Sequence, residues 1–169
     1  DHGSHFRTRN GEYKRSCHDA SIHIPMIVYG PGFEKGEEIE ELVSLIDLPP
    51  TFLKMAGLEV PDYMQGQPLQ KLINGETEDW PDEVFLQISE SQVGRAIRTD
   101  RWKYSVRAPH KNGWEDSQSE SYVEDFLYDL KNDPHEKNNL VADPDYTDIR
   151  EDLAVRLKQR MAAAGETIP

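Results

Sequence analysis

Cysteine is almost absent from this 169-residue chain, which contains only Cys17. A single thiol cannot build an intrachain disulfide framework. The chain also lacks any apolar run near the roughly 18 residues that a membrane-spanning helix needs, which predicts no membrane segment. Basic residues are scarce too, since 19 lysines and arginines face 32 acidic residues, for a net charge of −13. Because such a charge repels nucleic acid, we expect no nucleic-acid partner.

The overall composition indicates a globular protein about the size of one domain, with many residues in loops. The hydrophobic fraction is only 36% and the mean hydropathy is −0.77. However, Trp, Tyr and Phe are well represented, which argues against disorder. A chain of this length can bury a substantial core.

The first 30 residues predict a polar loop that leads into a short strand. Residues 1–19 are polar, rich in His, Arg and Lys, and punctuated by glycine, as loops are. Met26–Tyr29 is a continuous apolar run between Pro25 and Gly30. Such a run predicts a strand that is buried on both faces, as in a parallel sheet.

The next stretch carries the start and stop signals of a helix. Asp47 is a good N-cap, Pro49 and Pro50 suit the first turn, and Gly57 suits the C-terminal end. The apolar stripe of this helix consists of Leu48, Phe52 and Met55. A second, shorter helix is predicted over 68–73.

After Pro81 the pattern changes to short β-rich segments separated by turn residues: EVFLQIS, GRAIRTD, KYSVRA and DFLYDL. They predict a four-stranded antiparallel sheet with one face covered. An i+4 repeat predicts an amphipathic C-terminal helix as the cover, formed by Ile149, Leu153, Leu157 and Met161. We therefore expect an α+β fold for the chain, with the strand at 26–29 and the Asp47 helix outside this sheet.

Side chains near the start of the chain could bind ions. The carboxylate of Asp1 and the imidazole of His2 could share a metal ion if the backbone turns at Gly3, although a solvated turn is the simpler interpretation. Lys14 could present its charge to an anion, or could simply be solvated. His5 could contact a leaving group or a substrate oxygen. The residues alone leave these alternatives open.

Two other polar stretches favour structural roles. Cys17 could act as a nucleophile beside His18, but no thiol-enzyme pattern surrounds it, and a buried structural cysteine is the commoner state. His18 could instead contact Asp19 or cap a turn. The ending FLYDLKNDPHEKNNL runs from a strand into a turn, where Glu136 and the asparagines after it can hydrogen-bond to the backbone. We predict a structural corner there.

Taken in order, five stretches closely resemble the C-terminal part of type I sulfatases, in the alkaline phosphatase-like superfamily. They are DHGSH with Lys14 after it, HDASIHIPMIVYGPGF, LVSLIDLPPTFLKMAGL, GRAIRTDRWKY and FLYDLKNDPHEKNNL. They follow the order of the family and cover nearly the whole chain. The pattern YDLxxDPxExxNL is especially characteristic of the family.

The resemblance implies hydrolysis of sulfate esters by a metal-assisted formylglycine mechanism. Asp1 and His2 match the family pair that binds a divalent cation, usually calcium. Because calcium prefers oxygen ligands, magnesium and manganese stay open. Lys14 matches the lysine that contacts the sulfate, where a cation can stabilise the oxygen charge that develops during S–O cleavage. His5 matches a histidine near the substrate.

The resemblance also implies that this chain is a fragment. Sulfatases make formylglycine from a C/S-x-P/A-x-R motif, whereas Cys17 is followed by His-Asp-Ala, and the family's Asp-Asp metal pair has no counterpart. We therefore expect residues 1–80 to end the large α/β domain, with the strand at 26–29 and the Asp47 helix as its remnants. Residues 81–169 would form a small C-terminal subdomain. We expect the isolated chain to be inactive.

The expected partners are a sulfated small molecule or sulfated glycan and the missing N-terminal part of the same protein. Family analogy suggests a periplasmic, secreted or lysosomal-type compartment. One alternative is a phosphoester or phosphonate hydrolase of the same superfamily. The other is a non-catalytic module that binds a glycan or a partner through the polar loop 109–124, which contains His110, Lys111 and Trp114.

Overall fold

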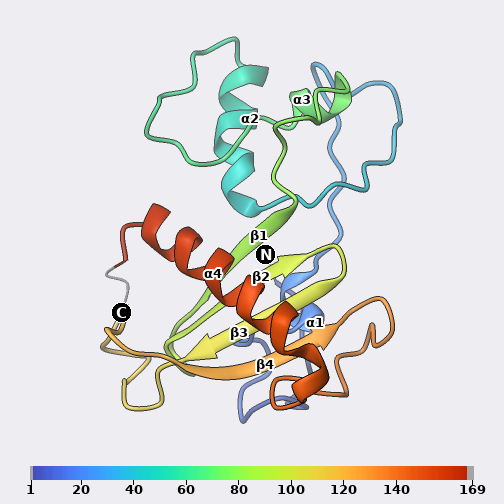
Figure 1. Cartoon of the computed structure of the whole chain (residues 1–169). Coiled ribbons are helices and arrows are strands. Elements are labelled where there is room, and N and C mark those ends of the chain that lie inside the picture. Colours follow the sequence, from blue (N-terminus) through green and yellow to red (C-terminus); the bar gives the residue numbers. More distant parts are fainter. Residues whose placement is uncertain (1, 167–169) are drawn as a thin grey trace. The chain divides into compact units, whose positions relative to one another are not determined.

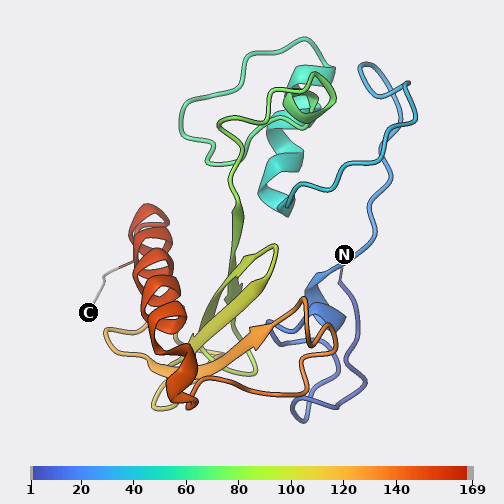
Figure 2. The same cartoon turned by 45° about the vertical axis from the view of Figure 1, so that its right-hand side comes forward.

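The computed structural model describes residues 2–166 (Figures 1 and 2). Its contacts divide the chain into two compact units. One contains the described residues up to Ile24 and those from Phe85 onward, and the other is Pro25–Val84. This grouping differs from the predicted boundary at residues 80 and 81. The assignment of residues 1–80 to a larger domain stays a prediction.

The first unit is built on one four-stranded sheet in the order β1-β2-β3-β4. Strands β2 and β3, and strands β3 and β4, pair antiparallel, with Ile97, Tyr104 and Leu127 in register across them. The strands are β1 (Glu83–Ile88), β2 (Gly94–Thr99), β3 (Trp102–Arg107) and β4 (Val123–Asp129). The four-stranded sheet predicted from the alternating segments is confirmed.

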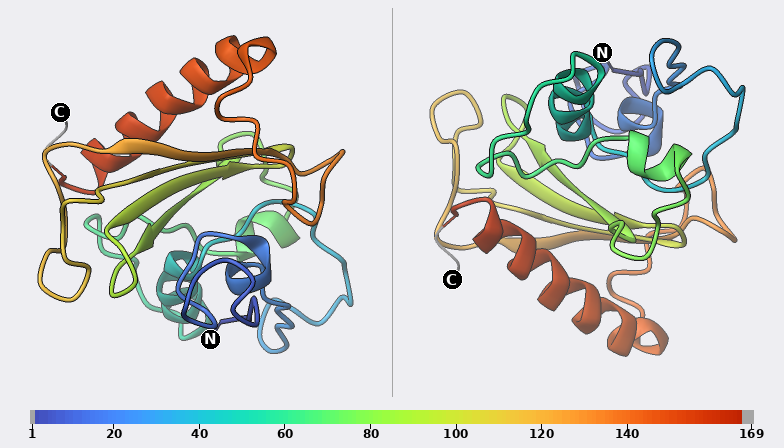
Figure 3. Two further views of the ribbon diagram at one scale, coloured as in Figure 1. Left: turned by 90° about the horizontal axis from the view of Figure 1, so that it is seen from below. Right: turned by 90° about the horizontal axis from the view of Figure 1, so that it is seen from above.

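Helix α4 (Thr147–Ala163), which follows the 3-10 turn η2 (Pro144–Tyr146), lies along one face of the sheet (Figure 3). Its buried residues Leu153, Leu157 and Met161 join a core cluster whose strand members include Ile97, Tyr104 and Leu127. The predicted i+4 stripe is therefore the buried face of the helix, and the helix ends before Gly165, whose φ is +82°. Among the described residues, no helix is long and apolar enough to cross a membrane.

The opposite face of the sheet is covered as well, contrary to the sequence prediction. The N-terminal segment, with the short helix α1 (Asp19–Ile22), lies against it (Figure 3). Cys17 is completely buried there in a cluster with Ala96, Phe126 and Tyr128. The prediction of one open face was wrong because the cover is a polar segment that contributes few apolar side chains.

The second unit contains the 3-10 turn η1 (Leu45–Asp47) and helices α2 (Leu48–Met55) and α3 (Gln70–Ile73). The carboxylate of Asp47 accepts the backbone N–H of Ser44 and that of Gln67, both at 2.8 Å. Both predicted helices form, and glycines with positive φ, Gly57 and Gly75, follow them. The small core consists of Phe33, Leu69 and Leu72, with partly buried neighbours that include Leu48 and Met55 but not the exposed Phe52.

The predicted strand at Met26–Tyr29 is not formed. Ile27 is 96% exposed and Tyr29 is 84% exposed, so the run is not buried on both faces. A parallel strand needs neighbouring strands that satisfy its backbone N–H and C=O groups. The described residues offer this run no such neighbour. The remnant strand was therefore a wrong prediction for this chain.

The packing of α4 leads to a stability prediction. Leu157→Ala removes a fully buried side chain from the core between α4 and the sheet. We expect the free energy of unfolding to fall by about 2–5 kcal/mol, measured by urea denaturation. Val155→Ala, on the exposed side of the same helix, should stay within about 0.5 kcal/mol of the parent chain. Equal effects of the two substitutions would contradict the burial of this face.

Candidate functional site

The structure brings His2 and Lys14 together. The Nζ atom of Lys14 lies 3.0 Å from Nε2 of His2, and Nδ1 of His2 lies 2.7 Å from the carbonyl oxygen of Gly3. An ammonium group only donates, so Nε2 accepts from Lys14 and Nδ1–H donates to Gly3. Two of the predicted site residues thus share one hydrogen-bonded arrangement, although twelve positions separate them. Asp1, the predicted carboxylate ligand, lies outside the described residues.

Gly3 explains how the chain can turn at this point. Its N–H donates to the carbonyl of Ser21 at 2.8 Å, which ties the turn to helix α1. A Cβ atom on Gly3 would lie 2.1 Å from the carbonyl oxygen of Ala20. Only glycine allows this close approach of two backbone segments.

His5 is turned into the protein. Its side chain is only 2% exposed, and neither ring nitrogen has a hydrogen-bond partner among the described residues. Buried polar atoms are normally hydrogen-bonded, so the His5 imidazole is an exception that needs an explanation. Its predicted contact with substrate stays a prediction.

The described residues do not by themselves fit a divalent cation site. Among them, no group of three or more His, Cys, Asp or Glu side chains is arranged to hold a metal. His2 supplies one imidazole, but its Nε2 faces the ammonium group of Lys14. Any cation at this place would need further ligands from outside the described part of the chain.

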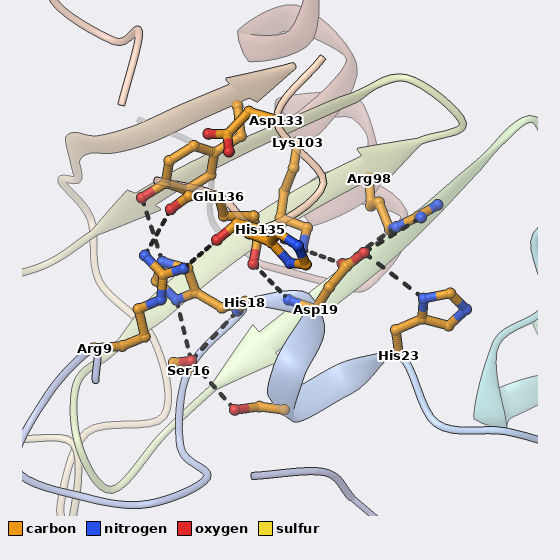
Figure 4. A network of polar contacts seen from close by, with 12 residues as sticks. Arg9, Ser16, His18, Asp19, His23, Arg98, Lys103, Asp133, His135 and Glu136 are labelled. Atoms are coloured by element: carbon orange, nitrogen blue, oxygen red, sulfur yellow. Dashed lines mark hydrogen bonds and ion pairs between the residues drawn. The ribbon is translucent and has the colours of Figure 1, made fainter. Parts of the chain in front are cut away.

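A buried cluster of charges holds the segment that carries Lys14 onto the sheet (Figure 4). The ammonium group of Lys103, on β3, is completely buried and forms ion pairs with Asp19 and with Glu136, the latter at 2.5 Å. The second oxygen of Glu136 accepts the backbone N–H of Asp19 at 2.9 Å. One strand, one N-terminal helix and one C-terminal corner therefore meet at a single ammonium group.

The cluster is electrically balanced. Arg98, on β2, adds a second cation, 3.4 Å from Asp19, so that two cations face two carboxylates. Burial alone would raise the pKa of Asp19, but the nearby Lys103 and Arg98 outweigh it and hold that pKa below its usual value. Asp19 is thus ionised, as a buried pair requires if it is to stabilise the fold.

The corner after β4 supplies the other half of the cluster. The carboxylate of Asp133 accepts the backbone N–H groups of Lys137 and Asn138, and Arg9 donates to the carbonyls of His135 and Glu136. This agrees with the predicted structural corner. Sequence reasoning did not identify the partnership of Glu136 with Lys103. The sequence did contain one signal for it, namely Lys103 itself, a charged residue in a strand whose neighbouring residues are buried.

Cys17 and His18 are both buried, as structural side chains are. Burial raises the pKa of the Cys17 thiol to about 12, so the thiolate nucleophile does not form near neutral pH. His18 lies 3.1 Å from the hydroxyl of Ser16 and 3.4 Å from that of Tyr128. Burial, assisted by the nearby Arg9, lowers the pKa of His18 to about 3.

Comparisons with known proteins point to one family. Residues 11–163 match the family model described as N-sulphoglucosamine sulphohydrolase, C-terminal. Arylsulfatase K of Mus musculus is 29% identical over 153 residues, which cover 85% of this chain and 26% of that protein. The chain therefore spans about a quarter of the length of this curated relative.

Two solved structures share the fold. A 2-O GAG sulfatase has a TM-score of 0.77 and 26% identity, over 97% of this chain and 35% of that one. The phosphonate monoester hydrolase of Agrobacterium radiobacter has a TM-score of 0.69 and 27% identity, over 96% of this chain and 34% of that one. Nearly all of the present chain thus corresponds to about a third of each of these proteins.

The charge cluster predicts that Lys103 is essential for stability. Lys103→Met leaves the buried Glu136 and the partly buried Asp19 without their shared cation. We expect a loss of about 3–5 kcal/mol in the free energy of unfolding, measured by urea denaturation. Lys158→Met, on the exposed side of α4, is the matched control and should have little effect. A Lys103 variant as stable as this control would disprove the role of the cluster.

The buried neutral His18 predicts acid sensitivity. Because its pKa is about 3 when folded and near 6.5 when unfolded, protons bind the unfolded state better between these values. Stability from this group is complete above pH 6.5 and is lost as the pH falls. We expect a loss of roughly 2–3 kcal/mol between pH 6.5 and 4.5. His18→Gln should flatten this pH dependence, whereas His135→Gln, whose side chain is exposed, is the control and should keep the pH dependence of the parent chain.

Proposed function

Because this chain belongs to the sulfatase family and matches the C-terminal part of its members, we propose that the whole protein hydrolyses sulfate esters. In this proposal the chain supplies part of the sulfate-binding site. The observation that carries the proposal is the contact between His2 and Lys14. These are two residues to which the family resemblance assigns neighbouring roles, and they come from different parts of a loop.

Lys14 suits a sulfate group for an electrostatic reason. Its ammonium group is a compact cation with several donors, which can face an oxygen that gains negative charge as the S–O bond breaks. The same short segment also contains Arg7, Arg9 and Arg15 in a chain whose net charge is −13. However, Arg9 donates to the carbonyls of His135 and Glu136, and Arg15 pairs with Glu12 and Glu90, so the proposal depends on the charge of Lys14 itself.

The cation and the nucleophile are assigned mainly to residues outside this chain. In this proposal Asp1 and His2 contribute to a divalent cation site, for calcium or for magnesium or manganese, and His5 lies near the substrate. The formylglycine comes from the N-terminal part of the protein, because the buried Cys17 is not in the required motif. Residues 1–80 would end the large α/β domain, and 81–169 would form the small subdomain.

The substrate class is a sulfated molecule, with a sulfated glycan as the first choice because a structural relative is a 2-O GAG sulfatase. A secreted or lysosomal-type compartment would fit such a substrate. The similarity to a phosphonate monoester hydrolase favours a second candidate, hydrolysis of a phosphonate or phosphate ester. Both reactions place a tetrahedral anion against Lys14, so the protein's relative rates on aryl sulfate and aryl phosphonate decide between them.

We predict that Lys14→Ala lowers kcat/KM of the full-length protein for an aryl sulfate by about 10²–10³-fold, because a charge-stabilising donor is lost. Lys158→Ala, which removes an exposed lysine of α4, is the matched control and should leave the rate unchanged. The isolated 169-residue chain should show no turnover. The proposal fails if the isolated chain hydrolyses the sulfate, or if Lys14→Ala matches its control.

A further inference from the structure

We propose that Glu90, in the loop between β1 and β2, is a positioning residue for Lys14, an inference that rests on the proposed function. Its carboxylate forms an ion pair with Arg15, the residue directly after Lys14. The side chain of a lysine is long and flexible, so the place that its ammonium group reaches depends on how firmly its backbone is held. By fixing Arg15, Glu90 keeps the Lys14 ammonium group where a developing negative charge needs it.

The backbone on both sides of Lys14 is held by hydrogen bonds. The N–H of Ser16 donates to the carbonyl of Lys14 at 2.8 Å, which makes Arg15 the central residue of a three-residue turn. On the other side, the carbonyl of Tyr13 accepts the N–H of His5 at 2.9 Å. Lys14 therefore projects from a tight turn, and Arg15 attaches this turn to the loops of the sheet.

Two consecutive residues of the β1–β2 loop bind Arg15. The Glu90 carboxylate pairs with the guanidinium group of Arg15, and the Ser91 hydroxyl donates to the Arg15 carbonyl oxygen at 2.8 Å. The same guanidinium group pairs with Glu12 at 2.8 Å and lies 5.2 Å from the centre of the Trp114 ring. Because two carboxylates neutralise it, Arg15 holds the turn rather than binding a substrate anion.

The backbone of Glu90 is strained. The N–H of Ser91 donates to the carbonyl of Ser89 at 2.8 Å across Glu90, whose φ is +68°. A three-residue turn with a positive φ at its centre is rare and strained, and glutamate seldom adopts that φ. Strained residues persist where the surrounding structure holds them, and they cluster at functional sites. Here the carbonyl of Gly113 provides the hold, since it accepts the Glu90 N–H at 2.7 Å.

The contact between Glu90 and Arg15 suits positioning better than stability. The side chain of Arg15 is 26% exposed and that of Glu90 is 40% exposed, and ion pairs of such exposure contribute little to the free energy of unfolding. Loss of the pair should therefore loosen the turn without unfolding the sheet. A small displacement of a charged group from its productive position is enough to slow a reaction.

The experiment compares variants of the full-length protein in the hydrolysis of an aryl sulfate. Glu90→Gln removes the charge and keeps the size of the side chain. We expect it to lower kcat about 5–10-fold with little change in KM, because Lys14 stabilises charge that develops in the transition state. Ser91→Ala, which removes the other contact with Arg15, should lower kcat in the same direction. Glu151→Gln, on the exposed side of α4, is the matched control and should leave kcat unchanged.

A double-mutant cycle shows whether Glu90 acts through Lys14. In the Lys14→Ala background, Glu90→Gln should have no further effect on kcat, since the ammonium group that it positions is already gone. The inference is overturned if Glu90→Gln matches Glu151→Gln, or if it lowers kcat by the same factor with and without Lys14. A large fall in the free energy of unfolding of Glu90→Gln would also overturn it, because the residue would then be structural.

Hydrogen exchange separates a failure of this inference from a failure of the proposed function. If Lys14→Ala matches its own control, the proposed function fails. Exchange of the backbone N–H groups of residues 13–17 in the full-length protein then still tests whether Glu90 holds this turn. Glu90→Gln should speed up this exchange by about threefold or more relative to Glu151→Gln. Equal exchange rates in the two variants would contradict the inference.

Discussion

The structure of the first unit depends on one buried cation, the ammonium group of Lys103. Its partners, Asp19 and Glu136, come from opposite ends of the chain, so the cluster joins the N-terminal segment and the C-terminal corner across β3. Ion pairs buried in this way are costly to assemble and more costly to break, because a charge left alone in the interior has no solvent. The cluster therefore sets where the N-terminal segment lies on the sheet. The same cluster therefore helps to fix the position of the segment that contains Lys14.

Local patterns in the sequence were sufficient to predict the four strands and the helices α2, α3 and α4. Alternation marks β1 to β4, and the i+4 stripe at Leu153, Leu157 and Met161 marks α4, because each pattern reports which side of an element meets the core. The second cover of the sheet could not be predicted in this way. It consists of Cys17 and polar residues such as Ser16 and His18, whose burial depends on distant partners rather than on neighbours in the sequence.

The same limit explains the prediction at Met26–Tyr29. An apolar run reports a preference for burial, but whether it becomes a strand depends on neighbouring strands that the run itself does not specify. The candidate site shows a related limit. No periodic pattern in the sequence indicates that His2 contacts Lys14, and only the family resemblance assigned the two residues neighbouring roles. The structure adds Gly3, whose lack of a side chain permits the turn that brings them together.

Three independent anchors fix the segment from His2 to Asp19. Gly3 bonds to Ser21, Arg15 pairs with Glu90 near the Trp114 loop, and Asp19 joins Lys103. Two of these partners, Glu90 and Lys103, belong to the sheet and its connections, so the position of Lys14 is determined largely by the β1–β2 loop and by β3. A change in the β1–β2 loop or in the corner after β4 would therefore move a cation that the proposed chemistry requires at a defined place, without touching any residue of the site itself.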